Sequence, residues 1–326
     1  MNVQQIFDLG VKLAIQADPR GKKGIEKYFK AIKQDYDDLN TKEKQYFDKS
    51  KLTNPYPDSM IHVDDGRKEV KRVLAGIDIG GSEILLADQL GLHNKKIDLT
   101  ISHHPNGRSF ASLHEVMDMS TGVYESYGLP IHIAERIMEE RIREVGRGLM
   151  PINHYKTIDI AKILKINLMD THTISDNLVD KFFNDLFTKN KPETLSDIMS
   201  LVMDIPEFQE AKRNGMGPKI LSGSPRSHVG KWIVEMTGGT NPSSKVYTEF
   251  SKVGFSTIIS MHMKEDGFKV AQENHLNVVI TGHMASDSLG MNLFLDELEK
   301  QGIEIVPCGG LIRVSRVAKK MSKSNV

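Results

Sequence analysis

The sequence is short of cysteine, and it carries no excess of either charge. Cys308 is the single cysteine among 326 residues, so no disulfide can form within the chain and an all-thiolate metal site is excluded. This cysteine usage predicts a reducing, cytoplasmic location. The 43 basic residues are balanced by 43 acidic residues, so the electrostatic footprint of a dedicated nucleic-acid-binding protein is absent. We therefore expect no nucleic-acid partner.

Long apolar runs are also missing. No segment is apolar over the length that a transmembrane helix needs. The first ten residues mix polar and apolar side chains, unlike the charged-then-apolar order of a signal peptide. With 39% hydrophobic residues, the composition predicts an ordinary globular protein of about two domains, with no membrane partner.

The first part of the chain differs from the remainder. Apolar residues between Ile25 and Tyr36 recur at helical spacing, which predicts a helical arm that packs on the core or lies against a neighbouring subunit. Strand and helix patterns then alternate from Val73 to about residue 190, and again from Lys219 to Arg316. We predict an α/β protein of two α/β lobes with a metal cleft between them. The predicted division is an N-terminal helical arm at 1–65, a first lobe at 66–190 and a second lobe at 191–326.

Three apolar, strand-like runs end in histidine with carboxylates nearby. They lie at 98–105, 166–177 and 277–287. In α/β proteins the carboxyl ends of strands are where functional side chains converge. We therefore expect one cleft to gather His103, His104, His172, Asp176, His283 and Asp287. This set is large enough to hold two divalent metal ions.

The two later runs each pair a histidine with an aspartate four residues on. A helix is predicted to begin near residue 284, so His283 lies at its start and Asp287 one turn further. At that spacing both side chains can face one metal ion. Asp176 follows His172 by the same interval.

The first run carries two adjacent histidines, His103 and His104. On an extended strand neighbouring side chains point in opposite directions. Both can therefore bind metal only if the backbone turns there, which Pro105 favours. In the alternative, one histidine ligates while the other contacts substrate.

The types of donor atom narrow the choice of metal ion but do not select a single one. Imidazole with carboxylate suits Zn, Fe, Mn, Co or Ni. Two such divalent ions, about 3.5 to 4 Å apart and bridged by a carboxylate and a water, would activate that water and clamp an oxyanion. Asp176 and Asp287 are both candidates for the bridge.

These motifs resemble those of the Nif-three-like proteins, also called type 2 GTP cyclohydrolase I homologues. The resemblance covers roughly residues 70 to 320. It rests on S-H-H-P at 102–105, H-T-x-x-D-N at 172–177 and T-G-H-x-x-S-D at 281–287. It implies a dinuclear centre in a ring-like homo-oligomer, with His172 beside five metal ligands: His103, His104, Asp176, His283 and Asp287.

One position departs from the family pattern. The commonest pattern has glutamate where this chain has Asp287. Losing one methylene shortens the reach of the carboxylate by about one C–C bond. We therefore expect metal number, spacing or identity to differ from those of relatives.

The sequence offers little for binding GTP. The run 73–90 predicts a strand, a glycine turn and a helix, but it lacks both a P-loop lysine and a G-x-G-x-x-G pattern. We interpret it as a tight βα connection, with Asp78 placed to face the site. Arg226 and Lys231 are the remaining candidates for an anionic substrate, and solvated loop charge is the simpler interpretation of both.

The leading hypothesis is a metal-dependent hydrolase acting on a small substrate, nucleotide-like or a cyclic amide. His172 or His262 would assist proton transfer, since His262 follows another strand-like run at 257–261. The alternative is a metal-binding regulatory or protein-interaction protein without catalytic turnover. A third hypothesis is a metal-free enzyme whose histidines bind substrate.

Overall fold

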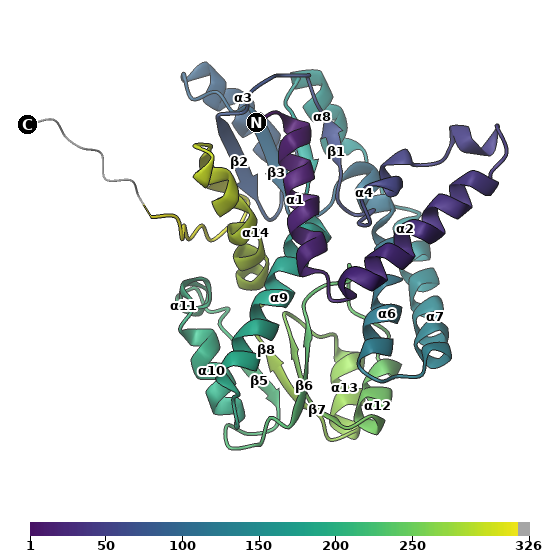
Figure 1. Cartoon of the computed structure of the whole chain (residues 1–326). Coiled ribbons are helices and arrows are strands. Elements are labelled where there is room, and N and C mark those ends of the chain that lie inside the picture. Colours follow the sequence, from purple (N-terminus) through teal and green to yellow (C-terminus); the bar gives the residue numbers. More distant parts are fainter. Residues whose placement is uncertain (319–326) are drawn as a thin grey trace, which may run out of the picture.

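The computed structural model describes residues 1–318 and contains two lobes, each built on its own β-sheet (Figure 1). The five-stranded sheet has the order β1 (Ile61–Val63), β4 (Leu168–Asp170), β3 (Leu99–Ser102), β2 (Arg72–Gly76) and β9 (Glu304–Cys308). The four-stranded sheet has the order β5 (Lys219–Ser222), β8 (Asn277–Ile280), β7 (Phe255–Ser260) and β6 (Lys231–Glu235). The predicted fold class, two α/β lobes after an N-terminal helical arm, is confirmed.

The two sheets repeat one arrangement. In each sheet, the strand that comes first in the chain is an edge strand and pairs antiparallel with its neighbour. These pairs are β1 with β4 and β5 with β8. The other pairs are parallel in both sheets. Strand β9 adds a further parallel edge beside β2, so the chain returns to the first sheet at residues 304–308. The predicted three-part division of the chain stays a prediction.

Two long helices cross between the lobes. Helix α9 (His172–Asn190) begins just after β4 of the first sheet, but its Phe183 and Phe187 lie in the core of the second sheet. Helix α14 (His283–Lys300) begins just after β8 of the second sheet, and its Phe294 and Leu298 lie in the core of the first. The helices pack against each other in the middle of the molecule (Figure 1). Their amino-terminal turns therefore lie between the two sheets.

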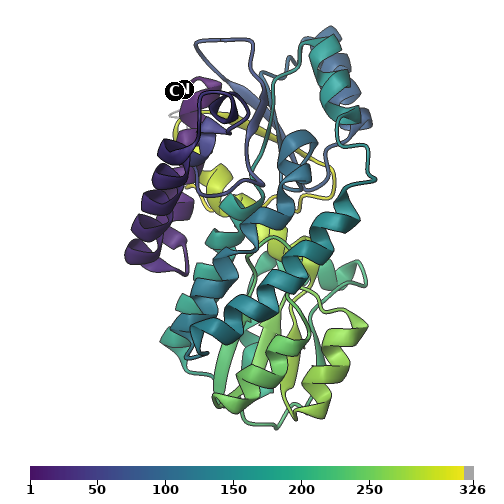
Figure 2. The ribbon, with the colours of Figure 1, turned by 90° about the vertical axis from the view of Figure 1, so that its right-hand side faces the viewer.

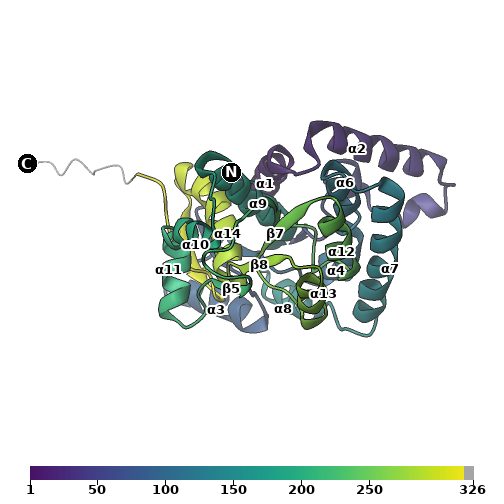
Figure 3. The same cartoon turned by 90° about the horizontal axis from the view of Figure 1, so that it is seen from below.

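The N-terminal helical arm is formed by α1 (Val3–Ala17) and α2 (Gly21–Asp38), followed by the short 3-10 helices η1 (Glu43–Gln45) and η2 (Lys49–Leu52). Helix α1 packs on α9 and buries one apolar face in the first core. Helix α2 buries only Ile25 and runs along the outside of the molecule (Figure 3). Asp18, at the turn between the helices, accepts a hydrogen bond from the Tyr56 hydroxyl at 2.9 Å, which ties the arm to the first lobe.

The connection from β3 to β4 carries five helices: α4 (Gly107–Ala111), α5 (Leu113–Val116), α6 (Met119–Ser126), α7 (Ile131–Leu149) and α8 (Lys156–Leu164). Helices α6 and α7 extend down beside the second lobe (Figure 2), where Tyr124 and Met138 share a core with Ile233, Phe250 and Ile258. The first and second lobes are thus joined by this pair as well as by α9 and α14.

The remaining helices are α3 (Gly81–Leu92), α10 (Leu195–Met203), α11 (Pro206–Arg213), α12 (Lys245–Lys252) and α13 (Glu265–Glu273). Of these, α12 packs on β7 and α13 on β8, α3 packs on α8, and α11 packs on α14 and α10. Within residues 1–318, no helix combines the length and the hydropathy needed to cross a bilayer.

Candidate metal centre

Both adjacent histidines of the first run face the space between the lobes. Strand β3 ends at Ser102, and the next two residues continue its pairing, because the amides of His103 and His104 donate to the carbonyls of Gly76 and Ile77, both at 2.9 Å. The hydroxyl of Ser102 donates to the carbonyl of His104 at 2.7 Å and holds the chain in a turn. The two imidazole rings consequently lie 5.0 Å apart between centroids.

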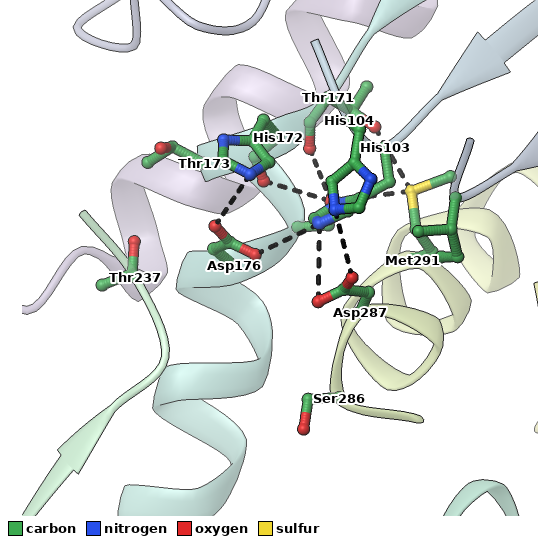
Figure 4. A network of polar contacts seen from close by, with 12 residues as sticks. His103, His104, Thr171, His172, Thr173, Asp176, Thr237, Ser286, Asp287 and Met291 are labelled. Carbon is green, nitrogen blue, oxygen red and sulfur yellow. Dashed lines mark hydrogen bonds and ion pairs between the residues drawn. The ribbon is translucent and has the colours of Figure 1, made fainter. Parts of the chain in front are cut away.

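The other two runs supply their side chains from the first turns of the crossing helices. His172 and Asp176 lie on α9, whereas His283 and Asp287 lie on α14. Figure 4 shows the side chains of the first pair converging on His103 and His104, with Asp287 approaching from the other helix. The structure thus brings together all six side chains that the sequence predicts to meet.

Three of the four imidazoles are oriented by an acceptor at Nδ1. Nδ1 of His104 lies 2.7 Å from Oδ1 of Asp78, and Nδ1 of His172 lies 2.8 Å from Oδ2 of Asp58. Nδ1 of His103 lies 2.9 Å from the hydroxyl oxygen of Ser175. A proton assigned to each Nδ1 leaves the lone pair of Nε2 free, which is the tautomer that a metal ion needs.

The Nε2 atoms point at two buried carboxylates. Nε2 of His103 lies 3.6 Å from Oδ1 of Asp176 and 3.5 Å from Oδ1 of Asp287. The other oxygen of Asp287 lies 3.5 Å from Nε2 of His104 and 3.3 Å from Nε2 of His283. These separations are long for hydrogen bonds and leave room for a cation between the donors.

The carboxylates also lack hydrogen-bond donors. Oδ1 of Asp176 and both carboxylate oxygens of Asp287 are buried without a hydrogen-bond partner within the described chain. A buried carboxylate without a partner is costly. A bound cation would supply the missing partner, so the donor set fits metal ions.

The donor atoms divide into overlapping sets, each within 4.8 Å of one another. One set contains His103, Asp176 and Asp287, and another contains His104, His283 and Asp287. Asp287 belongs to both and offers a different oxygen to each, which is the arrangement of a bridging carboxylate. A third set groups His172 with His103 and His104. The buried cluster is therefore suitable for a dinuclear metal centre.

Without metal, the cluster must hold protons to balance its charges. Burial alone would raise the pKa of Asp287, but His103 and His104 outweigh it and hold that pKa below its usual range. Burial would lower the pKa of His104, yet Asp287 and Asp78 raise it to about 9. Burial, with the nearby Asp287, raises the pKa of Asp176. A cation must therefore displace protons, so metal affinity should rise with pH.

A small chamber adjoins the cluster on the side of the second lobe. Besides cluster residues, it is lined by the end of β6 and the following loop, and by the end of β7, namely Glu235, Met236, Thr237, Gly239, Thr240, Asn241, Pro242, Ser260, Met261 and His262. His262 lies outside the donor sets, with its ring centroid 4.6 Å from that of His283. The side chain of His283 is 38% exposed, whereas that of His103 is 1% exposed, so access to the cluster is from the His283 side.

Other sequence predictions meet mixed outcomes. The glycine run is a tight connection between β2 and α3, and its Gly80 amide donates to Glu83 at 2.8 Å. Asp78 reaches the site as predicted, because its carboxylate contacts Nδ1 of His104. Lys231 is not at the site, because it begins β6 and its ammonium lies 3.8 Å from the ring centroid of Phe255. Arg226 is exposed on the loop before β6.

Sequence reasoning missed Asp58 and the acidic residue of the chamber, Glu235. Asp58 lies in an irregular segment before β1, far from His172 in sequence, so no local pattern marks it. Glu235 ends an apolar strand beside the same cleft, which is the signal that revealed the histidines. Burial raises the pKa of Glu235 to about 7.

The fold and the cluster define an α/β protein of two repeated lobes with a buried His/Asp centre between them. A NIF3 superfamily protein from Sphaerobacter thermophilus matches with a TM-score of 0.73 and 23% identity, over 95% of this chain and 99% of that one. The chain therefore has the NIF3 superfamily fold.

Other solved structures superpose less well. Reduced HcgD from Methanocaldococcus jannaschii matches with a TM-score of 0.47 and 17% identity, over 82% of this chain and 94% of that chain. A Bacillus cereus protein related to NIF3 matches with a TM-score of 0.40 and 12% identity, over 80% of this chain and 93% of that chain. No protein-family model and no curated protein matches the sequence.

Proposed function

We propose that this protein is a metal-dependent hydrolase whose dinuclear centre acts on a small substrate, nucleotide-like or a cyclic amide. The observation that carries the proposal is that three buried carboxylate oxygens lie among four imidazoles and lack hydrogen-bond donors within the described residues. Residues that fit two cations and share one carboxylate are typical of centres that activate water. Zn, Fe, Mn, Co and Ni all suit these donors.

The division of the donors assigns a role to each residue. Asp287 would bridge the two ions, with His103 and Asp176 holding one and His104 and His283 holding the other. When bound, the pair of ions would supply Lewis acidity and an acidified water. Asp58 and Asp78 would fix the rings of His172 and His104 through their Nδ1 atoms.

Proton transfer falls to a residue beside the ions. His172 lies close enough to His103 and His104 to serve as a further ligand. His262 belongs to no donor set, yet it lines the chamber next to His283. We therefore assign proton transfer to His262, with His172 supporting the first ion.

The chamber favours catalysis over a purely structural role. A structural metal site is closed by protein ligands, whereas a catalytic one keeps a position open for substrate. Here the donor atoms line a chamber on the second-lobe side. A small-molecule substrate, a homo-oligomeric assembly and a cytoplasmic location remain expectations of the same proposal.

The test is hydrolytic turnover by protein reconstituted with each candidate metal. A panel of cyclic amides and nucleotides would be followed by product analysis, with His262→Ala as the variant. We expect at least one substrate to be hydrolysed by the metal-loaded wild type and much more slowly by His262→Ala. Retained metal without turnover on any substrate would instead favour a regulatory metal-binding protein.

A further inference from the structure

The wall of the chamber holds two oxygens without donors. One is Oε1 of Glu235 and the other is Oδ1 of Asn241, and both atoms are buried without a hydrogen-bond partner within residues 1–318. Both residues line the chamber that also contains Asp176, His283 and Asp287. Buried acceptors are normally satisfied, so two in one small chamber require an explanation.

The other polar atom of each side chain is engaged. The hydroxyl of Tyr247 donates to Oε2 of Glu235 at 2.8 Å. The amide nitrogen of Asn241 donates to the carbonyl of His262 at 3.2 Å, and the backbone carbonyl of Asn241 accepts from Nε of Arg141 at 3.1 Å. Each side chain is thus held in place with one acceptor left over.

The loop that carries Asn241 is fixed against the helices packed beside it. Gly238 and Gly239 have φ values of 100° and 86°, which favour glycine. A Cβ at Gly239 would lie 2.7 Å from Cγ1 of Val116. The hydroxyl of Thr237 donates to Oδ1 of Asn177 on α9 at 2.7 Å. The acceptors are therefore preorganised, which lowers the cost of binding a ligand.

The chemistry of the lining selects the ligand. Among the described residues that line the chamber, none is lysine or arginine. An anionic group would find no side-chain cation on this wall, whereas a ligand N–H would find two acceptors. Bound divalent ions in the same chamber would favour the carboxylate form of Glu235 and keep Oε1 an acceptor.

We propose that Glu235 and Asn241 form a substrate subsite that binds the N–H groups of a small neutral or cationic ligand, such as the ring N–H of a cyclic amide. The proposal rests on the hydrolase function above and names the part of the substrate that the protein recognises. The chamber has about 50 Å³ of space for water-sized molecules, so this wall accepts a group of only a few heavy atoms.

The test uses ethyleneurea, a cyclic urea with two N–H donors, and cyclopentanone, a ring of the same size that has none. Binding of each would be measured by calorimetry on the full-length, metal-loaded protein. We expect ethyleneurea to bind at least about tenfold more tightly, because two buried acceptors stay unpaired with cyclopentanone. Equal affinity, or no detectable binding of ethyleneurea, would overturn the proposal.

Variants separate the two acceptors from the metal centre. Glu235→Gln and Asn241→Ala should each weaken ethyleneurea binding by about tenfold. In the glutamine variant the one remaining oxygen accepts from the Tyr247 hydroxyl, which leaves an NH2 group where the free acceptor was. Asn241→Asp, which keeps an oxygen at that position, should retain binding. The control is Glu265→Gln, whose parent side chain is 74% exposed on α13 and which should behave as wild type. Unchanged binding in both Glu235→Gln and Asn241→Ala would contradict the subsite.

Metal content and turnover are measured on the same samples. Loss of metal in a variant would be seen directly, and a variant that binds ethyleneurea weakly while keeping its metal supports the subsite. Failure of the hydrolase proposal would instead appear as full metal content and selective ethyleneurea binding without turnover on any substrate. The two failures are therefore distinguishable.

Discussion

The two lobes are built alike around the cluster, but they contribute differently to it. Strand β3 of the first lobe ends in Ser102, His103 and His104, and strand β7 of the second ends in Ser260, Met261 and His262. The position of His103 is thus an apolar methionine in the second lobe. The first lobe supplies most of the nitrogen donors, while the second supplies the chamber beside them.

The repeated framework extends to individual hydrogen bonds. The hydroxyl of Ser260 donates to the carbonyl of His262 at 2.9 Å, as Ser102 does to His104 at 2.7 Å. The amide of Thr281 donates to the carbonyl of Ser260 at 2.9 Å, and that of Thr171 to Ser102 at the same distance. One scaffold therefore presents most of the imidazoles from the first lobe and most of the chamber lining from the second.

The helix starts repeat as well, with one insertion. His172 and Asp176 of α9 correspond to His283 and Asp287 of α14, with a serine before each aspartate. Gly282, with φ of 110°, is the additional residue between Thr281 and the histidine. One turn beyond the aspartates, α9 buries the carboxyl of Asp180 where α14 buries the apolar Met291.

The largest expected effect comes from replacing Asp287, the carboxylate that both donor sets share. Asp287→Asn should reduce metal content from two ions per chain to nearly none, whereas Asp176→Asn should retain about one. Plasma mass spectrometry after purification without an affinity-tag nickel column measures both. Asp266→Asn, on the surface helix α13, serves as the control. Equal losses in the two variants would contradict the bridging role of Asp287.

The next prediction compares equivalent strand-end histidines. His104→Ala should lower metal content to about one ion, because this ring belongs to a donor set, whereas His262 belongs to none. His262→Ala should keep both ions yet lose at least about a hundredfold in turnover. Metal analysis and steady-state kinetics on the same samples check the pair. Loss of metal in His262→Ala would mean that the second lobe ligates as the first does.

The third prediction concerns the buried carboxyl that distinguishes α9 from α14. Burial raises the pKa of Asp180 from 3.8 to about 7. The folded metal-free protein then keeps this proton while the unfolded chain has lost it, so stability falls as pH rises from about 4 to about 7. Asp180→Asn should remove this loss of stability. The metal-free variant should therefore melt several degrees above the metal-free wild type at pH 8, but not at pH 4.

Thermal unfolding of the metal-free proteins across this pH range measures the difference. Asn184 donates to Oδ1 of Asp180 at 3.0 Å, and the amide of Met236 approaches Oδ2 at 3.4 Å. An asparagine retains one acceptor for these donors. A difference that does not change with pH would show that Asp180 is ionised in the folded state.

The smallest effect is expected at the inserted glycine. Gly282→Ala places a side chain at φ of 110°, which should cost about 2 kcal/mol of stability. Gly91→Ala is the matched control, because no atom lies near its added Cβ and it sits inside α3. That control should be neutral or stabilising by up to about 1 kcal/mol. Chemical denaturation of both variants tests the comparison.

Much of the cluster could be predicted because its members obey local rules. The spacing of His283 and Asp287 places both on one helix face, and strand ends in an α/β sheet converge. The internal repeat was also visible in the sequence, since H-x-x-S-D occurs at 172–176 and again at 283–287. This shared pattern relates the starts of α9 and α14.

The rest depended on tertiary packing that no local pattern records. The crossing of α9 and α14 into opposite cores follows from which sheet each helix covers, and helix periodicity does not carry that information. Asp58 reaches His172 from an irregular segment, and Asn241 comes from a loop shaped by two glycines. Such partners are defined only once the chain has folded.

Anomalous diffraction from crystals of the metal-loaded protein tests the central claim most directly. We predict two peaks about 3.5 to 4 Å apart between the lobes, one on either side of the Asp287 carboxylate. One peak would be near His103 and Asp176, and the other near His104 and His283. A single peak, or peaks away from Asp287, would contradict a centre shared by the two lobes.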